Sequence, residues 1–341
     1  MPLIGQQDLQ LLVIAGDTKQ LGPVVISATS RRNPHGNFLG ASGLERLVAL
    51  QKHLMHITAW TNYRSHPSLV VMPSALFYRE QMKPADGLDW DTKLARDVLT
   101  LINGHRFRKA YRNISALSPD DRQRFVNVVS AARRDPATQS LVDVGGIVAI
   151  LQLLRMLRDV GGVSLGRVGV ISMYKDDVVT LRQRLEEDKM SNVDVEVTVD
   201  DEEGGSAEAS TVDAFQGREK DVIIVHFVTT MPKQMGGVRH PFGFVRDPHR
   251  LNVATTRAKQ VQILVGNYAN WSEWCEGPKL SNGDQSLCRH MFGLMDYVET
   301  NGAIVDWAKV DYKLLARHPQ YGLERQCCST LMLSAVVAAG M

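Results

Sequence analysis

The stretch "GRVGVISMYKDDVVTLRQRLEEDK" (166–189) joins an apolar run to a charged run, and it decides the fold. Its first part is short and rich in Val and Ile, which is typical of a strand buried on both faces of a parallel sheet. The charged part that follows predicts a helix. Three more apolar runs predict strands: "LQLLVIAGD" (9–17), "KDVIIVHFV" (220–228) and "VQILVGN" (261–267). Because strands alternate with helices, the sequence predicts an α/β fold with a parallel sheet.

Apolar residues at helical spacing predict further helices between these strands. The predicted helices are 43–55, 68–78 around an interruption at Pro73, 145–160 and 247–260. The strictly alternating stretch 193–200 predicts one more strand. The region 89–139 is rich in Arg and Asp, and we expect it to be a helical insertion or an irregular module.

The composition is that of a globular protein, with 44% hydrophobic and 22% charged residues in a chain of 341. A net charge of only +2 argues against a purely electrostatic binder, although a local basic groove remains compatible with it. The four cysteines (275, 288, 327 and 328) form no Cys-x-x-Cys pair, which favours a reducing compartment, the cytoplasm or the nucleus. The apolar end "LMLSAVVAAGM" (331–341) is too short to span a bilayer of about 30 Å, so we expect no membrane association.

Four polar stretches fall at predicted strand ends or helix starts: 16–23, 61–69, 210–219 and 249–259. Each has an ordinary structural explanation: a loop around Gln20, a salt bridge at a helix start for Arg64, and a solvated helix face for Arg250 and Arg257. The last two are seven residues apart, which places them on one face of the predicted helix. There a guanidinium group at the sheet edge suits a phosphate.

The stretch 210–219 contains a turn signal as well. Gly217 allows a backbone turn that other residues adopt only at a cost. Glu219 then faces either a sugar hydroxyl or water.

Taken in order, "GDTKQLGP…NYRSHP…GVISMYK…TVDAFQGRE…RLNVATTRAK…VGN" resembles motifs III to VI of superfamily 1B helicases. The branch it resembles most contains the nonsense-mediated-decay helicase and the RNA-silencing helicases of the Armitage and silencing-defective type. The resemblance covers about 11–267, apart from 89–139. It implies a RecA-like parallel sheet with helices on both faces, as in the second domain of a helicase. The implied domains are 1–40 (the end of a first RecA-like domain), 41–270 (the second, with an insertion at about 89–140) and 271–341 (a C-terminal tail).

The resemblance also implies roles for individual residues. Gln20 senses the γ-phosphate, and Arg64 and Arg257 are arginine fingers that neutralise charge on the departing phosphoryl group. The implied nucleotide contacts are Gly217, Glu219 and Arg250. The implied contacts to the nucleic-acid backbone are Ser172, Tyr174, Lys175 and Thr211, although Tyr174 has packing as an alternative. The implied cofactors are ATP and Mg²⁺ in the full-length context, and no residue of this chain is predicted to bind the metal.

Two elements of the ATP site are missing from the sequence. No Gly-Lys is followed by Ser or Thr, so there is no phosphate-binding P-loop. The Asp-Glu pair that binds Mg²⁺ should precede motif III, and "VTVDDEE" (197–203) is a poor substitute because it directly precedes motif V. We therefore expect the chain alone not to hydrolyse ATP, whether it is a fragment, a truncated gene model or a degenerate paralogue. Asp177 stands where the family usually has Gln, and an acid there would repel phosphate.

The leading hypothesis is the C-terminal part of an ATP-dependent RNA helicase of 5′ to 3′ polarity in RNA silencing or decay. Its expected partners are single-stranded RNA, a missing N-terminal RecA-like domain, and silencing or decay proteins. The alternatives are a DNA helicase of the same superfamily and a non-catalytic nucleic-acid-binding paralogue. The helicase hypothesis predicts that the guanidinium groups of Arg64 and Arg257 line one edge of one sheet. Placement on opposite sides of the molecule, or closure of either group in the interior, would contradict it.

Overall fold

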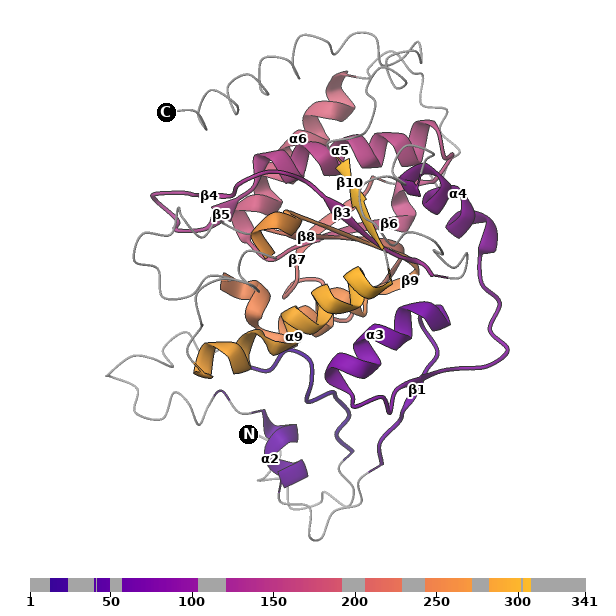
Figure 1. The fold of residues 1–341 in the computed structure, drawn as a ribbon, viewed down its shortest axis with the longest axis vertical. Helices are drawn as coiled ribbons and strands as arrows, with labels where there is room; N and C mark the ends of the chain where they lie inside the picture. The colour runs from indigo at the N-terminus through magenta and orange to yellow at the C-terminus, as the bar shows by residue number, and fades with distance from the viewer. Residues whose placement is uncertain are drawn as a thin grey trace, which may run out of the picture.

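A computed structural model of the chain describes residues 13–23, 40, 42–49, 57–103, 121–191, 206–228, 243–271, 282–301 and 303–307. Its centre is a six-stranded sheet of strand order β10-β3-β9-β8-β6-β7, and every neighbouring pair is parallel (Figure 1). The strands are β3 (Gln123–Asn127), β6 (Val168–Ser172), β7 (Glu208–Thr211), β8 (Lys220–Phe227), β9 (Ala258–Gly266) and β10 (Ile304–Asp306). The predicted α/β fold with a parallel sheet is confirmed.

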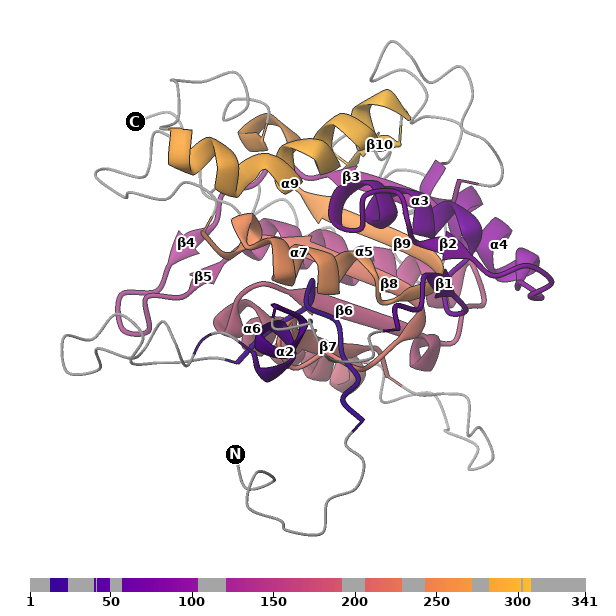
Figure 2. The same ribbon diagram turned by 90° about the horizontal axis from the view of Figure 1, so that it is seen from below.

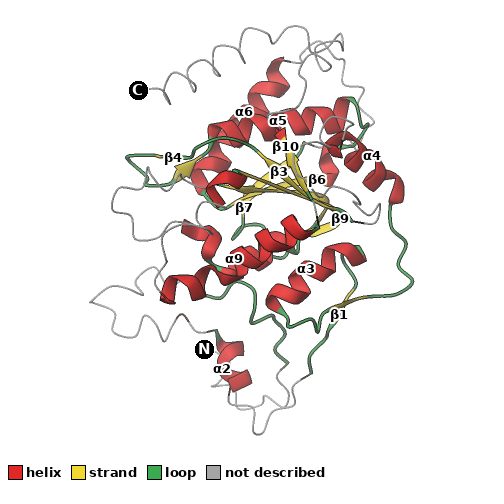
Figure 3. Ribbon diagram, viewed as in Figure 1, coloured by secondary structure: helices red, strands yellow, loops and turns green. Residues whose placement is uncertain are grey.

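Helices cover both faces of this sheet (Figure 3). The helices are α2 (Gly43–Ala49), α3 (Pro67–Phe77), α4 (Thr92–Asn103), α5 (Val144–Asp159), α6 (Lys175–Ser191), α7 (Pro248–Thr255) and α9 (Asn282–Thr300), with short 3-10 turns η3 (Leu165–Arg167) and η5 (Gly243–Arg246). Two small pairs of strands lie outside the sheet: β1 (Thr61–Asn62) with β2 (Lys83–Pro84), and β4 (Arg133–Arg134) with β5 (Leu141–Val142). Within the described residues, no helix has both the length and the apolar character needed to cross a membrane.

Alternation along the strands explains why the sheet needs two helical layers. In β8, Val222 and Ile224 pack with α4, α5 and α6, whereas Ile223, Val225 and Phe227 pack with α3, α7 and α9. Successive side chains of a strand point to opposite faces, so an unbroken apolar run must be covered on both. Figure 2 shows the two layers on either side of the strands.

Most predicted elements agree with the structure. The strand and helix predicted from 166–189 are β6 and α6, and 220–228 and 261–267 fall in β8 and β9. The helix predicted at 145–160 is α5, which Asp143 caps by accepting a hydrogen bond from the Gly146 amide. Helix α3 runs through Pro73, and the helix predicted at 43–55 is seen as α2 over its described part. The predicted strand 193–200 and the stretch 197–203 lie outside the described residues.

The strand predicted at 9–17 is wrong over its described part. Residues 13–17 form no strand, and Val13 is 77% exposed. No described strand pairs with this segment, so its backbone has no ladder to join.

The described parts of the region 89–139 belong to the sheet and its covering helices rather than to a separate module. They supply α4 and β3, and β3 lies between β10 and β9 with all five residues buried. The polar residues of β3 gave no sign of a buried strand, although Gln123 and Arg124 are almost fully buried in the structure. The Arg124 guanidinium donates to the carbonyl oxygens of Asp121 and Gln123 and forms an ion pair with Asp121. The region 271–341 likewise contributes to the core, through α9 and the edge strand β10.

The helix predicted at 247–260 ends early. Helix α7 stops at Thr255, and β9 begins at Ala258. The hydroxyl groups of Thr255 and Thr256 donate to the carbonyl oxygens of Leu251 and Asn252, a pattern that competes with a regular helix. Arg257 therefore lies in the turn between α7 and β9, and the argument that it shares a helix face with Arg250 is wrong.

Candidate functional site

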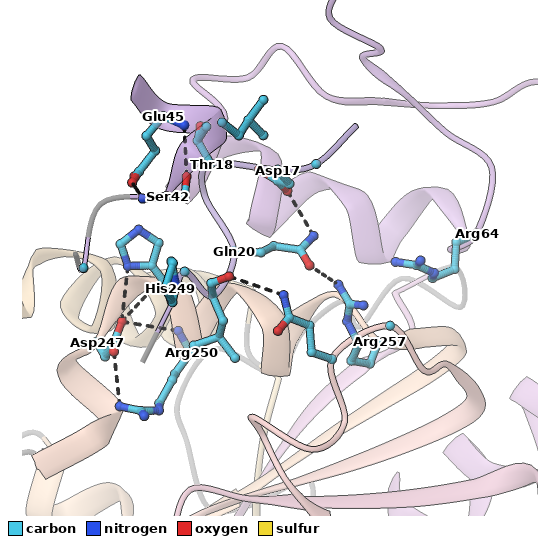
Figure 4. A pocket seen from close by; sticks show the side chains of 18 residues that line it. Asp17, Thr18, Gln20, Ser42, Glu45, Arg64, Asp247, His249, Arg250 and Arg257 are labelled. Atoms are coloured by element: carbon cyan, nitrogen blue, oxygen red, sulfur yellow. Dashed lines mark hydrogen bonds and ion pairs between the residues drawn. The ribbon is translucent and has the colours of Figure 1, made fainter. Parts of the chain in front are cut away.

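A cavity of about 670 Å³ is lined by residues that precede β8 and β9 and by residues at the start of α7. Its walls come from residues 16–23, α2, the loop between β7 and β8, and both ends of α7. The predicted site residues among those lining it are Gln20, Arg64, Gly217, Arg250 and Arg257. Figure 4 shows Gln20, Arg64 and Arg257 at one end of this cavity, and Asp247, His249 and Arg250 at the other. The structure thus brings together side chains from four stretches that are far apart in the sequence.

Arg257 is the most deeply placed of these cations, with only 2% of its surface exposed. Its guanidinium donates to the carbonyl oxygen of Val253 at 3.1 Å, to the hydroxyl of Thr256 at 3.0 Å and to the side-chain oxygen of Gln20 at 3.0 Å. Burial is the largest cause that lowers its pKa to about 10, and the positive charge of Arg64 adds to the effect. The group carries a positive charge at neutral pH, but no carboxylate contacts it directly among the bonds described for it.

Arg64 stands before α3, and its orientation depends on Glu219. The Nε of Arg64 donates to one carboxylate oxygen of Glu219 at 2.5 Å, and Lys259 contacts the other oxygen at 2.9 Å. The hydrogen bond from Lys259 is the largest cause that lowers the pKa of Glu219, and Arg64 lowers it further. Arg64 also donates to the carbonyl of Thr256 at 3.3 Å. Glu219 therefore sits between two cations and ties Arg64 to the start of β9.

The two arginines line one cavity as predicted, but Arg257 is only 2% exposed, and this closure counts against the hypothesis. Both guanidinium groups line one cavity at the amino-terminal end of β9, one just before the strand and the other bonded to the turn that precedes it. Arg257 is nearly closed off, but Gln20 rather than the hydrophobic core lies over its outer nitrogen (Figure 4). Two like charges in a partly desolvated cavity favour an anion between them.

Gln20 is held by a network that the sequence did not reveal. Its amide donates to Asp17 at 3.0 Å, and the same carboxylate oxygen accepts from the Tyr78 hydroxyl at 2.6 Å. The side chain of Asn252 donates to Tyr78 at 2.8 Å and to the carbonyl of Lys19 at 2.8 Å. Burial and the Asp17 carboxylate raise the pKa of Tyr78, so its hydroxyl stays a donor. These bonds fix the segment 13–23 against α3 and α7.

Gly217 has the backbone angle that the sequence analysis required. Its φ is +82°, a left-handed value that other residues rarely adopt. The preceding side chain, Gln216, donates to the carbonyl of Leu21 at 3.4 Å and closes one side of the cavity.

Arg250 lies at the opposite end of the cavity from Arg64 (Figure 4). Two of its nitrogens contact the carboxylate of Asp213, each at 3.2 Å, and a third contacts Asp247 at 3.3 Å. Its guanidinium carbon lies 4.4 Å from the centre of the Phe244 ring. Arg250 is therefore already paired with two carboxylates, unlike Arg257.

The four residues predicted to contact nucleic acid lie at or just after the carboxyl ends of β6 and β7. Lys175 is exposed and Thr211 is half-buried, whereas Ser172 and Tyr174 are 1% and 7% exposed. The Tyr174 hydroxyl accepts a hydrogen bond from the Phe244 amide at 3.3 Å. In this conformation, packing is the better description of Tyr174.

Asp177 does not face solvent, so its carboxylate is not placed at the surface to repel a phosphate as the sequence analysis expected. It is fully buried, and one carboxylate oxygen lies 2.7 Å from Nδ1 of His226. The other oxygen accepts from the Asp143 amide at 3.0 Å. Asp177, which stands where the resemblance predicts Gln, thus has the buried side chain of His226 as its partner.

Tyr78, Asn252 and Lys259 are site residues that the sequence analysis did not identify. Lys259 lay within a stretch quoted for its motif, so a signal was present. Tyr78 is the last residue of the helix predicted at 68–78, and nothing nearby in the sequence indicates its role. Its hydrogen-bond partner, Asp17, is 61 residues away. Among the described residues, no group of three or more His, Cys, Asp or Glu side chains is arranged to hold a metal ion.

Comparison with known proteins shows which family the chain resembles. The AAA domain family matches residues 39–269. An ATP-dependent helicase of Methanocaldococcus jannaschii is 30% identical over 256 residues, covering 75% of this chain and 32% of that protein. Regulator of nonsense transcripts 1 of Dictyostelium discoideum is 27% identical over 256 residues, covering 75% of this chain and 16% of that protein.

A third relative, ATP-dependent helicase NAM7 of Saccharomyces cerevisiae, is 28% identical over 256 residues, covering 75% of this chain and 23% of that protein. The chain thus spans no more than 32% of the length of these curated relatives. With a RecA-like parallel sheet and a family match over two thirds of its length, the chain belongs to the AAA domain family, within the superfamily 1 helicases.

Proposed function

We propose that this chain is the C-terminal part of an ATP-dependent RNA helicase, and that its cavity receives the terminal phosphates of ATP. The observation that carries the proposal is the pair of guanidinium groups, Arg64 and Arg257, in one cavity with Gln20 between Arg257 and the opening. Burial lowers the pKa of Arg257 and the charge of Arg64 lowers it further. A phosphate oxygen placed there would relieve both effects.

Three residues of the cavity then have a physical part in the reaction. Arg257 is preorganised by the Val253 carbonyl and the Thr256 hydroxyl, so little side-chain movement accompanies charge neutralisation. Arg64 is held by Glu219, and a phosphate would compete with that carboxylate for the guanidinium. Gln20 bonds Arg257 on one side and Asp17 on the other, which places it to respond to an anion that displaces it.

Hydrolysis needs groups that this sequence does not contain. The P-loop and the residues that bind Mg²⁺ would come from an N-terminal RecA-like domain, which would present ATP to the cavity. ATP would then hold the two domains together, and hydrolysis would release them. We propose single-stranded RNA as the substrate, because the "GLERL" (43–47) and "LFY" (76–78) stretches resemble the silencing group most. RNA silencing or decay, in the cytoplasm, is the corresponding process.

Binding of a non-hydrolysable ATP analogue with Mg²⁺ tests the cavity. Isothermal titration calorimetry on the full chain should show that Arg64→Ala and Arg257→Ala each weaken binding by about tenfold or more, since a charge-assisted hydrogen bond contributes roughly 1.5–3 kcal/mol. Arg184→Ala is the matched control, because Arg184 forms an exposed ion pair with Glu187 on α6 and does not line the cavity among the described residues. Measurable binding by the unmodified chain that is equally tight in all three variants would show that the cavity does not take the phosphates.

A second measurement addresses the nucleic acid. Matched single-stranded RNA and DNA oligonucleotides of the same sequence should bind with a preference for RNA. A preference for DNA would redirect the proposal to a DNA helicase of the same superfamily. Absence of binding to either would contradict the helicase proposal.

A further inference from the structure

Phe244 is an exposed aromatic side chain beside the residues predicted to contact nucleic acid. It belongs to η5, and 45% of its surface is exposed. Its ring centre lies 5.1 Å from that of Tyr174, which follows the carboxyl end of β6. Tyr174 itself is buried, so Phe244 is the member of this pair that solvent reaches.

The position of Phe244 is fixed by its neighbours. Gly243 has φ +50°, and a Cβ at that position would lie 1.9 Å from the Tyr174 hydroxyl oxygen. Only glycine allows this approach, in which the same hydroxyl accepts the Phe244 amide hydrogen. Arg250 covers one side of the ring and is itself fixed by Asp213 and Asp247. An exposed ring held this firmly loses little freedom when a ligand contacts it.

The surroundings of the ring carry positive charge. Burial raises the pKa of Tyr174, and the positive charges of Arg134, Arg250 and Arg246 act on its hydroxyl in the opposite direction. Arg134 is exposed in β4, and Lys175 is exposed at the start of α6. The β4–β5 hairpin is fixed beside α6, because Thr138 is hydrogen-bonded to Asp176 and the Asp176 amide donates to Ser140.

An exposed aromatic ring with Arg250 against it and Arg134 and Lys175 exposed on neighbouring elements suits one kind of partner. Bases of a single strand contact aromatic side chains, while arginine and lysine side chains follow the phosphates. We propose that Phe244 contacts a base of a bound single strand, and that Arg134 lies along the path of its phosphates. This inference rests on the proposed helicase function and adds to it a residue that contacts the strand. It also links the two sites, because Arg250 lines the cavity and covers the same ring.

The test uses fluorescence anisotropy with the full chain and a labelled single-stranded oligonucleotide. Phe244→Ala should weaken binding by about fivefold or more, whereas Phe244→Trp should keep it, because base–aromatic contacts contribute on the order of 1–3 kcal/mol. Val71→Ala is the control for a lost apolar side chain, since Val71 is 55% exposed on α3. Thermal unfolding of each variant checks that the fold is retained.

An abasic oligonucleotide, which has the same phosphates and no bases, tests whether Phe244 contacts a base rather than the backbone of the strand. The loss caused by Phe244→Ala should disappear on the abasic strand. A loss that persists there, or an unchanged affinity on the normal strand, overturns the base contact and leaves the helicase proposal standing. Failure of the unmodified chain to bind the normal strand overturns both.

Discussion

His226 lies near the end of β8 with no exposed surface, and each of its ring nitrogens faces a carboxylate. Nδ1 lies 2.7 Å from Asp177, and Nε2 lies 3.7 Å from Asp143. Burial alone would lower the pKa of His226, but the charge of Asp177, its hydrogen bond to the ring and the nearby Asp143 carboxylate raise it to about 10. The same contacts lower the pKa of Asp143 despite its burial. The imidazole is therefore charged at neutral pH.

This residue predicts how stability depends on pH. Because the folded-state pKa is raised above the value of 6.5, the contribution of His226 to stability is fully present below about pH 6.5 and is lost as the pH rises toward 10. Urea unfolding at several pH values should show a free energy of unfolding that falls across this window. In His226→Gln, that part of the fall should be absent. An identical pH profile in both proteins would show that the histidine is neutral in the folded state.

Site residues that belong to a recognisable sequence motif could be predicted. Site residues whose role depends on a hydrogen bond to a residue far away in the sequence could not. Arg64 and Arg257 stand out in their motifs, and the structure places both in one cavity. Asn252 and Tyr78 are 174 residues apart, and their hydrogen bond depends on how α7 packs beside α3. Nothing local in either stretch indicates that contact. The partner of Asp177 was hidden for the same reason, since His226 reads only as part of an apolar strand.

Helix α5 begins where the buried histidine is packed, and this restricts its first turn. A Cβ added at Gly146 would lie 2.0 Å from Nε2 of His226, in a part of the core where the ring has no exposed surface. The glycine is therefore required for packing, although its φ is not in the left-handed region. Its amide also donates to the capping carboxylate of Asp143.

Gly146→Ala should destabilise the protein, although alanine normally favours a helix by about 1 kcal/mol over glycine. Overpacking a filled core costs typically 1–3 kcal/mol, and movement of His226 would also disturb two ion pairs. The midpoint of thermal unfolding should therefore fall. Val144→Ala is the control in the same helix turn, since Val144 is 45% exposed and its replacement should change the free energy of unfolding by no more than about 0.5 kcal/mol. A midpoint raised by Gly146→Ala would contradict the packing argument.

Among the elements, apolar strands were predictable and the polar strand β3 was not. Periodicity and composition identified β6, β8 and β9 because their residues are Val, Ile and Leu. Strand β3 has the sequence "QRFVN", and its buried polar side chains are hydrogen-bonded, Arg124 to the carbonyl oxygens of Asp121 and Gln123, and Gln123 to Gln262 in β9. The end of α7 was also missed, since the hydroxyl groups that end it lie in a stretch of helical composition.

In the whole molecule, the last described segments belong to the core. Strand β10 pairs with β3 at the edge of the sheet, and α9 covers the face that holds Phe125 and Phe227. Trp271 packs against these two rings, with centre distances of 6.1 Å and 5.0 Å. The boundary at 270 that the motifs suggested therefore cuts through packed structure.

Two truncated chains test this arrangement. A chain ending at residue 307 keeps β10 and α9, and it should unfold in one cooperative thermal transition. A chain ending at residue 270 loses Trp271, α9 and β10, which leaves one face of the sheet uncovered and β3 as an exposed edge. We expect this chain to aggregate or to lack a cooperative transition in calorimetry and near-ultraviolet circular dichroism. If both chains unfold at the same temperature, the segment 271–307 is an appendage, and the sheet is stable with β9 and β3 as its last packed strands.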